Sequence, residues 1–172
     1  MSFGGAKRRL LGREFSRTDS KARVLVPVRM RDELGGQITM TTGLLGELRC
    51  YRDDSFVAYA DYVLTQCEDG DDRDRLSQHI LSPAMTGLEF DPSGRLTVRD
   101  QFQRETDIGK NTDVAIVWRF EGWMEIWNRT SYDSYRRDPA GYMADQTKIY
   151  KGIRMPNGPA ALAQPRTSSA GE

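Results

Sequence analysis

The chain has 172 residues, of which 38% are hydrophobic and 29% are charged, and its 25 basic residues balance 25 acidic ones. This composition is typical of a soluble folded protein with a modest core. It excludes a membrane-spanning protein, because no apolar run approaches the ~20 residues that cross a bilayer. The N-terminus carries no apolar segment with a cleavage site behind its basic residues, so we expect no secretory signal.

Net charge gives no argument for nucleic acid, but the distribution of charge does. Residues 1–31 hold nine basic and two acidic residues, whereas residues 68–74 are mostly acidic. A neutral chain with a basic end and an acidic middle can bind a polyanion on its basic face and repel it from its acidic face. A solvated charge run remains the alternative on charge alone.

The first predicted unit spans residues 12–56 and follows a flexible basic arm at residues 1–11. A β-branched apolar run, a helix-prone stretch before Gly35 and a turn bracketed by Gly43 and Gly46 define its elements. The elements that we predict are a strand at 23–28, a helix at 29–34, and strands at 37–42 and 47–51.

Residues 57–84 predict a helical connector that breaks near Gly70. Cys50 and Cys67 have no metal-ligand spacing and fit a reduced cytoplasmic compartment. His79 lacks a nucleophile or a second ligand nearby, and the acidic run 68–74 lacks EF-hand spacing. We therefore expect no metal, no cofactor and no enzymatic activity.

The second predicted unit spans residues 85–129. Its elements are a strand at 95–98, a helix at 100–106, and strands at 113–120 and 123–127. Its three tryptophans, Trp118, Trp123 and Trp127, indicate a buried or interfacial surface. Residues 130–172 predict a C-terminal helix and a tail that has too few large apolar groups to fold.

A short motif occurs twice, at the same place in each unit. Asp19 and Arg23 flank a turn before one strand, and Asp91 and Arg95 do so 72 residues later. An Asp can accept backbone N–H groups in a turn, and an Arg can pair with it in a bidentate contact. Arg also suits phosphate oxygens and guanine edges. An intramolecular staple and a DNA contact both remain open for these arginines.

These motifs resemble the MraZ family of transcriptional regulators. The first unit carries the resemblance in residues 12–15 (GREF), 18–23 (TDSKAR), 26–27 (VP) and 29–31 (RMR), and the second in 91–95 (DPSGR) and 120–127 (FEGWMEIW). The family usually has a glycine where this chain has Ala22 and a proline where it has Arg99. The loop before residues 124–127 differs, and the basic arm is longer.

The resemblance implies a mainly β, α+β fold. It consists of two tandem swapped-hairpin β-barrel repeats, as in AbrB and MazE proteins, joined by the helical connector. It also implies a ring-like homo-oligomer in the cytoplasm that associates with the nucleoid. The implied activity is sequence-specific binding of double-stranded DNA at repeated promoter boxes upstream of the division and cell-wall gene cluster, including its own gene.

We hypothesise that the basic residues of the first unit and the arm face this DNA. Those residues are Arg23, Lys21, Arg13, Arg17, Arg29, Arg9, Arg8 and Lys7. Arg95, with Arg99 and Arg104, is a candidate for an equivalent patch in the second unit. An antitoxin-like or scaffold module on the same fold, which binds a protein partner, remains the alternative function.

Overall fold

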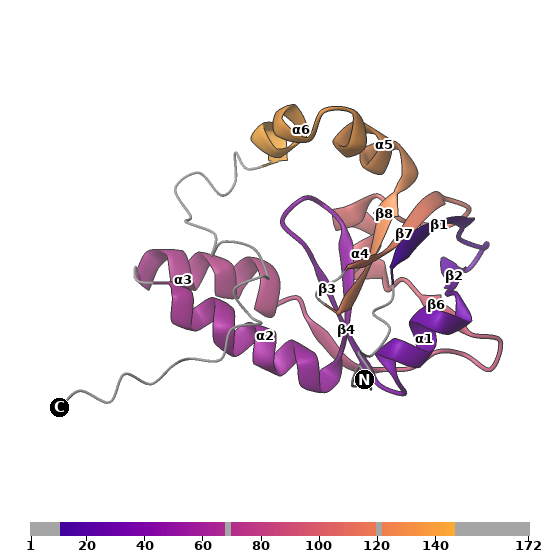
Figure 1. The fold of residues 1–172 in the computed structure, drawn as a ribbon, viewed down its shortest axis with the longest axis horizontal. Helices are drawn as coiled ribbons and strands as arrows, with labels where there is room; N and C mark the ends of the chain where they lie inside the picture. The colour runs from indigo at the N-terminus through magenta and orange to yellow at the C-terminus, as the bar shows by residue number, and fades with distance from the viewer. Residues whose placement is uncertain (1–10, 68–69, 120–121, 147–172) are drawn as a thin grey trace, which may run out of the picture.

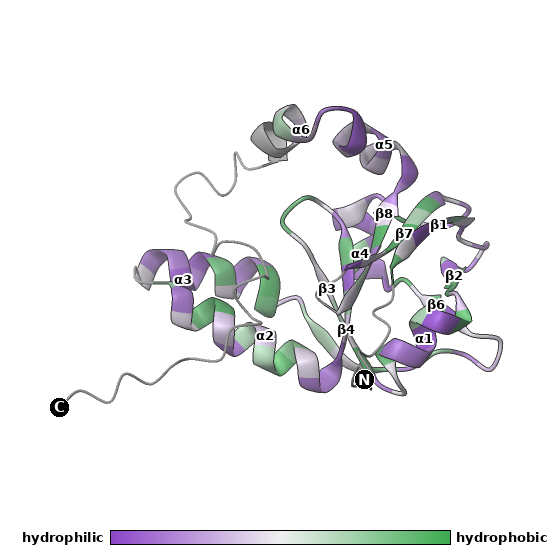
Figure 2. Ribbon diagram, in the orientation of Figure 1, coloured by the Kyte–Doolittle hydropathy of each residue, from purple (hydrophilic) through white to green (hydrophobic). Residues whose placement is uncertain are grey.

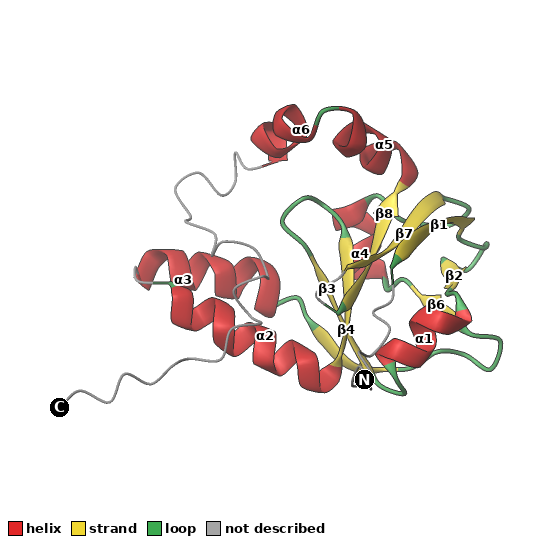
Figure 3. Ribbon diagram, in the orientation of Figure 1, coloured by secondary structure: helices red, strands yellow, loops and turns green. Residues whose placement is uncertain are grey.

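The computed structural model describes residues 11–67, 70–119 and 122–146. They form an α+β fold of antiparallel strands and short helices (Figures 1 and 3). The first half contains β1 (Gly12–Arg17), β2 (Arg23–Leu25), α1 (Val28–Leu34), β3 (Ile38–Thr42) and β4 (Leu48–Arg52). The second half repeats this order with β5 (Met85–Leu88), β6 (Arg95–Thr97), α4 (Asp100–Thr106), β7 (Asp113–Arg119) and β8 (Trp123–Asn128).

Helices join the two halves and follow the second one. The connector contains α2 (Asp53–Gln66), α3 (Gly70–Leu76) and a π-helical turn, η1 (Ser77–Leu81). The chain continues into α5 (Arg129–Arg137) and α6 (Pro139–Gln146). The basic arm at residues 1–10 and the tail at 147–172 lie outside the described residues.

The two halves exchange their first strands. A six-stranded antiparallel sheet has the order β1-β7-β8-β4-β3-β5, so β1 pairs with the third strand of the second half and β5 with the third strand of the first. β2 and β6 pair only with each other and form a separate two-stranded ribbon.

The closed barrel that we predicted is not seen. Within the described residues β1 and β5 are the two edges of the sheet, and no strand pairing joins them. β2 and β6 have three residues each and, in the described part of the chain, pair only with each other, so they do not bridge the two edges of the sheet.

The main core lies between the inner face of the sheet and a layer made of the ribbon, α1 and α4. Because successive strand side chains point to opposite faces, Ile116 and Met124 enter this core from the sheet, and Val24 enters it from the ribbon. Met30 of α1 and Phe102 of α4 close it, both fully buried. Figure 2 accordingly shows hydrophobic residues concentrated along β7, between hydrophilic ends.

Aromatic side chains cover the outer face of the sheet. Trp123 packs with Tyr51 and Phe56 near α2, and Trp127 packs with Tyr132 of α5. The prediction that the three tryptophans are buried is confirmed, with exposed fractions of 8%, 6% and 3% in chain order. The connector and the C-terminal helices therefore cover the side of the sheet that the ribbon leaves open.

Two element boundaries differ from our prediction by more than one residue. β2 ends at Leu25 because Pro27, at φ −53°, already stands at the start of α1. α2 begins at Asp53, inside the predicted first unit, because Asp53 and Asp54 occupy its first turn, where carboxylates are favourable. Asp53 also accepts a hydrogen bond from Thr39 Oγ1 at 2.8 Å.

The structure also places the two cysteines and the histidine that we considered from sequence as metal ligands or catalytic groups. Cys50 and Cys67 are both buried free thiols. His79 lies exposed in η1. In the described part of the chain, no group of three or more His, Cys, Asp or Glu residues is arranged to hold a metal ion. None of the described helices combines the length and the apolarity needed to cross a membrane.

Candidate nucleic-acid interface

The first turn, residues 19–22, is fixed by Asp19. Its Oδ1 accepts the backbone N–H groups of Lys21 at 2.8 Å and Arg23 at 3.0 Å. Its Oδ2 accepts Nε of Arg23 at 2.8 Å and lies 2.7 Å from Arg23 Nη2. One carboxylate thereby holds both the turn and the guanidinium that follows it.

The second turn, residues 91–94, has the same contacts. Asp91 Oδ1 accepts the N–H groups of Ser93 and Arg95, both at 2.9 Å, and its Oδ2 accepts Arg95 Nε at 2.8 Å. The staple reading of both motifs is therefore correct in geometry. The staples engage Nε and Nη2 of Arg23 and Nε of Arg95 with carboxylates, which makes these donors less available to a ligand.

The two turns are also coupled to each other across the ribbon. Arg23 Nη1 lies 3.8 Å from Asp91 Oδ2, and Arg95 Nη1 lies 3.8 Å from Asp19 Oδ2. Each guanidinium thus faces two carboxylates, and the four groups together are electrically neutral. Positive charge for a polyanion must come from the residues around them.

Backbone contacts repeat at the same 72-residue offset beyond the staples. Val26 N–H donates to the carbonyl of Gly94 at 3.2 Å, and Val98 N–H donates to that of Ala22 at 2.9 Å. Arg31 Nε donates to the carbonyl of Val26, and the Gln103 side chain donates to that of Val98. The ribbon and its two helices are therefore arranged about a local pseudo-two-fold axis.

The last position of each turn has a positive φ, 55° at Ala22 and 78° at Gly94. Replacing Gly94 by alanine is expected to lower the free energy of unfolding by about 1–2 kcal/mol, because an L side chain disfavours this conformation. The new Cβ would also clash with Cζ of Arg31, so that side chain must move. Urea unfolding measures the loss.

Ala22→Gly is the matched control at the equivalent position. It relieves the same backbone preference but removes a fully buried methyl group, so its effect on the free energy of unfolding should be smaller than that of Gly94→Ala. Equal losses in both variants would contradict the conformational argument.

The staples also predict a dependence of stability on pH. The backbone N–H and then the guanidinium of Arg23 lower the pKa of Asp19 from 3.8 to about 2. The equivalent contacts lower the pKa of Asp91. A carboxyl whose pKa is lower in the folded state stabilises fully above its unfolded pKa, and this contribution is lost as pH falls through its folded pKa.

We therefore expect the stability difference between the wild type and Asp19→Asn to be constant above about pH 5 and to shrink between pH 3.8 and about 2. Urea unfolding across this pH range measures it. A difference that does not change with pH would rule out the charged carboxylate as the source of the stabilisation.

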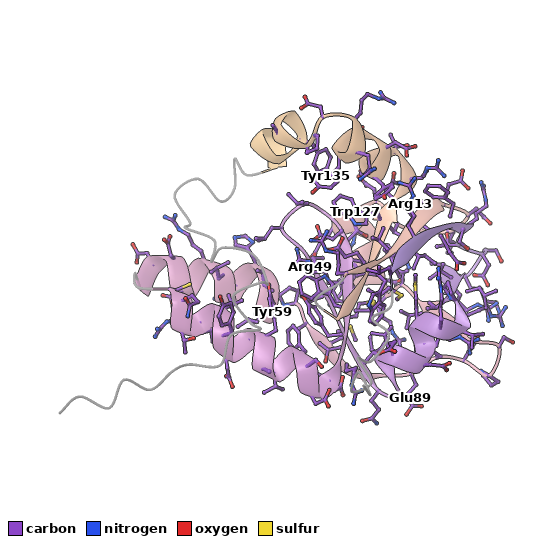
Figure 4. All side chains as sticks on the ribbon, viewed as in Figure 1. Arg13, Arg49, Tyr59, Glu89, Trp127 and Tyr135 are labelled. Atoms are coloured by element: carbon purple, nitrogen blue, oxygen red, sulfur yellow. The ribbon has the colours of Figure 1, made fainter. Side chains whose placement is uncertain are left out.

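The structure separates the basic residues that we grouped from sequence. Lys21 is exposed in the first turn. Arg13 lies on the outer face of β1, where it donates to Tyr132 Oη at 3.1 Å (Figure 4). Arg17 and Arg29 are exposed but paired, with Asp113 at 2.9 Å and Glu14 at 3.1 Å respectively. Lys7, Arg8 and Arg9 lie outside the described residues.

In the second half, Arg99 and Arg104 are exposed and Arg95 is held in its staple. Sequence reasoning missed Lys110, which is exposed in the loop before β7. That loop is tied to the first turn, because Asn111 N–H donates to the Asp19 carbonyl at 3.1 Å. The sequence signal for this loop was its length, because it has several more residues than the equivalent loop of the first half.

Sequence reasoning also missed a buried charge cluster on the outer face of the sheet. Arg49 Nε lies 2.6 Å from Glu47 Oε1 and 3.9 Å from Glu125 Oε1. Glu125 accepts both neighbouring indoles, Trp123 Nε1 at 3.1 Å and Trp127 Nε1 at 2.9 Å. Burial and the neighbouring Glu47 carboxylate raise the pKa of Glu125. Figure 4 places Arg49 between Tyr59 of the connector and Trp127.

The fold and the ribbon define an α+β protein of antiparallel sheets whose halves exchange edge strands around a pair of Asp–Arg staples. No protein-family model matches the chain. The chain is, however, similar to curated proteins named transcriptional regulator MraZ over most of its length. Identity is 26% with the protein of Lachnoclostridium phytofermentans, covering 67% of this chain and 82% of the relative.

Two further MraZ regulators extend the comparison. That of Finegoldia magna is 27% identical over 72% of this chain and 84% of its own. That of Mesoplasma florum is 24% identical over 78% of this chain and 91% of its own. The resemblance to the MraZ family that the motifs predict is thus confirmed, and the relatives are transcriptional regulators rather than enzymes.

Proposed function

We propose that this protein is a DNA-binding transcriptional regulator of the MraZ type. It binds repeated promoter boxes upstream of the division and cell-wall gene cluster, including its own gene. The observation that carries the proposal is a stapled ribbon with exposed cations around its first turn, in a chain similar to MraZ regulators over 67–78% of its length. Phosphate contacts from such cations supply affinity and register, and base-edge contacts supply the choice of sequence.

The domain organisation that goes with this function is two swapped-hairpin repeats, residues 12–56 and 85–129, joined by the connector at 57–84. The matched contacts at an offset of 72 residues support it, as does the exchange of β1 and β5 between the halves. The basic arm, with Lys7, Arg8 and Arg9, reaches the phosphate backbone beside the first repeat.

The protein acts as a ring-like homo-oligomer associated with the nucleoid. One ribbon offers few contacts, and a ring that repeats it can engage repeated boxes at high effective concentration. Exposed apolar side chains on the first half are available for contacts between subunits: Phe15 is 48%, Leu25 56% and Val28 61% exposed.

A gel-retardation experiment with the region upstream of the protein's own gene tests the proposed function. We expect retarded complexes with this duplex and weaker binding to a shuffled duplex. We also expect the free protein to have a mass in solution several times that of one 19.5 kDa chain. Binding that fails on both duplexes at low salt would overturn the function. A monomer that binds one duplex specifically would overturn only the ring.

A further inference from the structure

The two turns lie at opposite ends of a ribbon that is only three residue pairs long. In the antiparallel pairing Arg23 lies opposite Thr97, and Leu25 lies opposite Arg95. At about 3.4 Å per residue the ribbon is roughly 10 Å long. A duplex carries one phosphate charge per about 1.7 Å of its axis, so both ends could reach one duplex on length alone. The charge and polarity of the two ends indicate which of them faces DNA.

Building on the proposed function, we propose that only the ribbon end that carries the first turn faces DNA, with Lys21, Arg99 and Lys110 contacting phosphates. The other end, at residues 91–94, faces away from the duplex.

Three segments from both halves meet at the first turn. Lys21 lies within it. Arg99 follows Val98, whose N–H donates to the Ala22 carbonyl at 2.9 Å. Lys110 precedes Asn111, whose N–H donates to the Asp19 carbonyl at 3.1 Å. All three cations are exposed, and none has a carboxylate partner among the described residues.

The loop that carries Lys110 is rigidly attached to this end. Thr18 Oγ1 donates to the Gly109 carbonyl at 2.6 Å and accepts the Thr112 N–H at 2.8 Å. Asp107 and Asn111 adopt positive φ values of 52° and 50°, so the loop has a defined turn at each end. Lys110 is thereby positioned relative to Lys21 before any ligand binds.

Three carboxylates near this end are already engaged. Asp19 is held by Arg23, and Asp113 pairs with Arg17. Asp100, the neighbour of Arg99 in the chain, accepts the Gln103 amide at 3.1 Å. These contacts keep the acidic groups beside their own partners rather than beside the three cations.

The end at the second turn has a different chemistry, although its backbone is the same. Ser93 stands where the first turn has Lys21, and Pro27 stands where the other end has Arg99. Leu25 and Val28, both more than half exposed, lie on the segment bonded to Gly94. Its cation, Arg31, is half-buried and donates to the Val26 carbonyl at 3.0 Å.

The local charge of the matched segments agrees with this difference. Residues 13–34 contain six basic and four acidic residues, and the equivalent residues 85–106 contain three and four. Since two of the cations at the first turn, Arg99 and Lys110, come from the second half, the ribbon gathers charge from both halves at one end.

Reciprocal variants at equivalent positions test the proposal on the full chain. Lys21→Ser should weaken binding to the upstream duplex at least threefold and reduce the log–log salt slope by about 0.9 per bound subunit. Ser93→Lys should leave affinity within twofold and the slope unchanged. Arg99→Gln and Lys110→Gln should behave like Lys21→Ser, and Arg75→Gln on α3, an exposed arginine of the connector, like the wild type.

The results of these variants support or contradict the proposal as follows. If Ser93→Lys strengthens binding as much as Lys21→Ser weakens it, both ends contact DNA and the proposal is wrong. If Lys21→Ser keeps the wild-type slope, the first end is not the contact. Thermal unfolding of each variant confirms that it is folded. A wild type that binds no duplex defeats the proposed function itself, which separates that failure from a failure of this inference.

Discussion

Replacing Arg49 by methionine is expected to lower the free energy of unfolding by about 3–5 kcal/mol, because it removes the cation from a buried pair and leaves the charge of its partner uncompensated. The Glu47 side chain is fully buried, that of Glu125 is 5% exposed, and that of Arg49 is 13% exposed. The fully buried Glu47 could then no longer be charged without a large desolvation cost, and Glu125 would keep, among the described residues, only Arg119 Nε, 3.7 Å from its Oε1, as a cationic neighbour. Urea unfolding at neutral pH measures the loss.

Arg52→Met is the matched control on the same strand. The Arg52 side chain is 52% exposed and pairs with an exposed Asp54 at 3.2 Å, so its removal should cost less than about 1 kcal/mol. Equal losses at the two positions would contradict the view that burial makes the Arg49 pair important. A triple variant, Glu47→Leu, Arg49→Met and Glu125→Gln, should recover part of the stability, because the three buried charged groups are all removed together.

Arg23→Lys is expected to weaken binding to the upstream duplex at least tenfold, although it preserves the positive charge. Arg23 pairs with Asp19 through Nε and Nη2, and its Nη1 lies near the carboxylate of Asp91. A lysine ammonium has no planar fork and cannot make this set of contacts. The first turn, with Lys21, would lose its fixed position, so Arg23 acts as a positioning residue.

Three measurements separate positioning from direct contact. The log–log salt slope of Arg23→Lys should stay near the wild-type value, because no phosphate contact is removed, while the affinity falls. Arg23→Ala should lose as much affinity as Arg23→Lys. Arg75→Lys, at an exposed position on α3 outside the candidate interface, serves as the control and should bind normally. Wild-type affinity in Arg23→Lys would refute the role that we assign to the staple.

The repeated order of elements in the two halves could be predicted from sequence, because its signal is local. An Asp, which favours turns, stands four residues before an Arg and a short apolar run at both places. The same spacing at Asp19 and Asp91 therefore predicted the same elements twice. The exchange of β1 and β5 could not be predicted, since alternation of side chains along a strand is the same whichever strand lies beside it.

The candidate site was predictable only in part, for a related reason. Lys21 is close in sequence to the motif and was included. Arg99 was assigned to a separate patch in the second half, because only the antiparallel pairing of β2 with β6 brings it to the first turn. The neutrality of the four staple groups also follows from that pairing. Glu47, Arg49 and Glu125 gave a weak signal, as charged residues at outward-facing strand positions that a sequence reading assigns to solvent.

A structure of the protein bound to a duplex from upstream of its own gene would test the central claim most directly. We predict Lys21 Nζ within about 3 Å of a phosphate oxygen, Arg99 and Lys110 on the same side of the duplex, and residues 91–94 turned away from it. A complex in which the β2–β6 ribbon does not contact the DNA, or in which both turns contact it equally, would contradict the account.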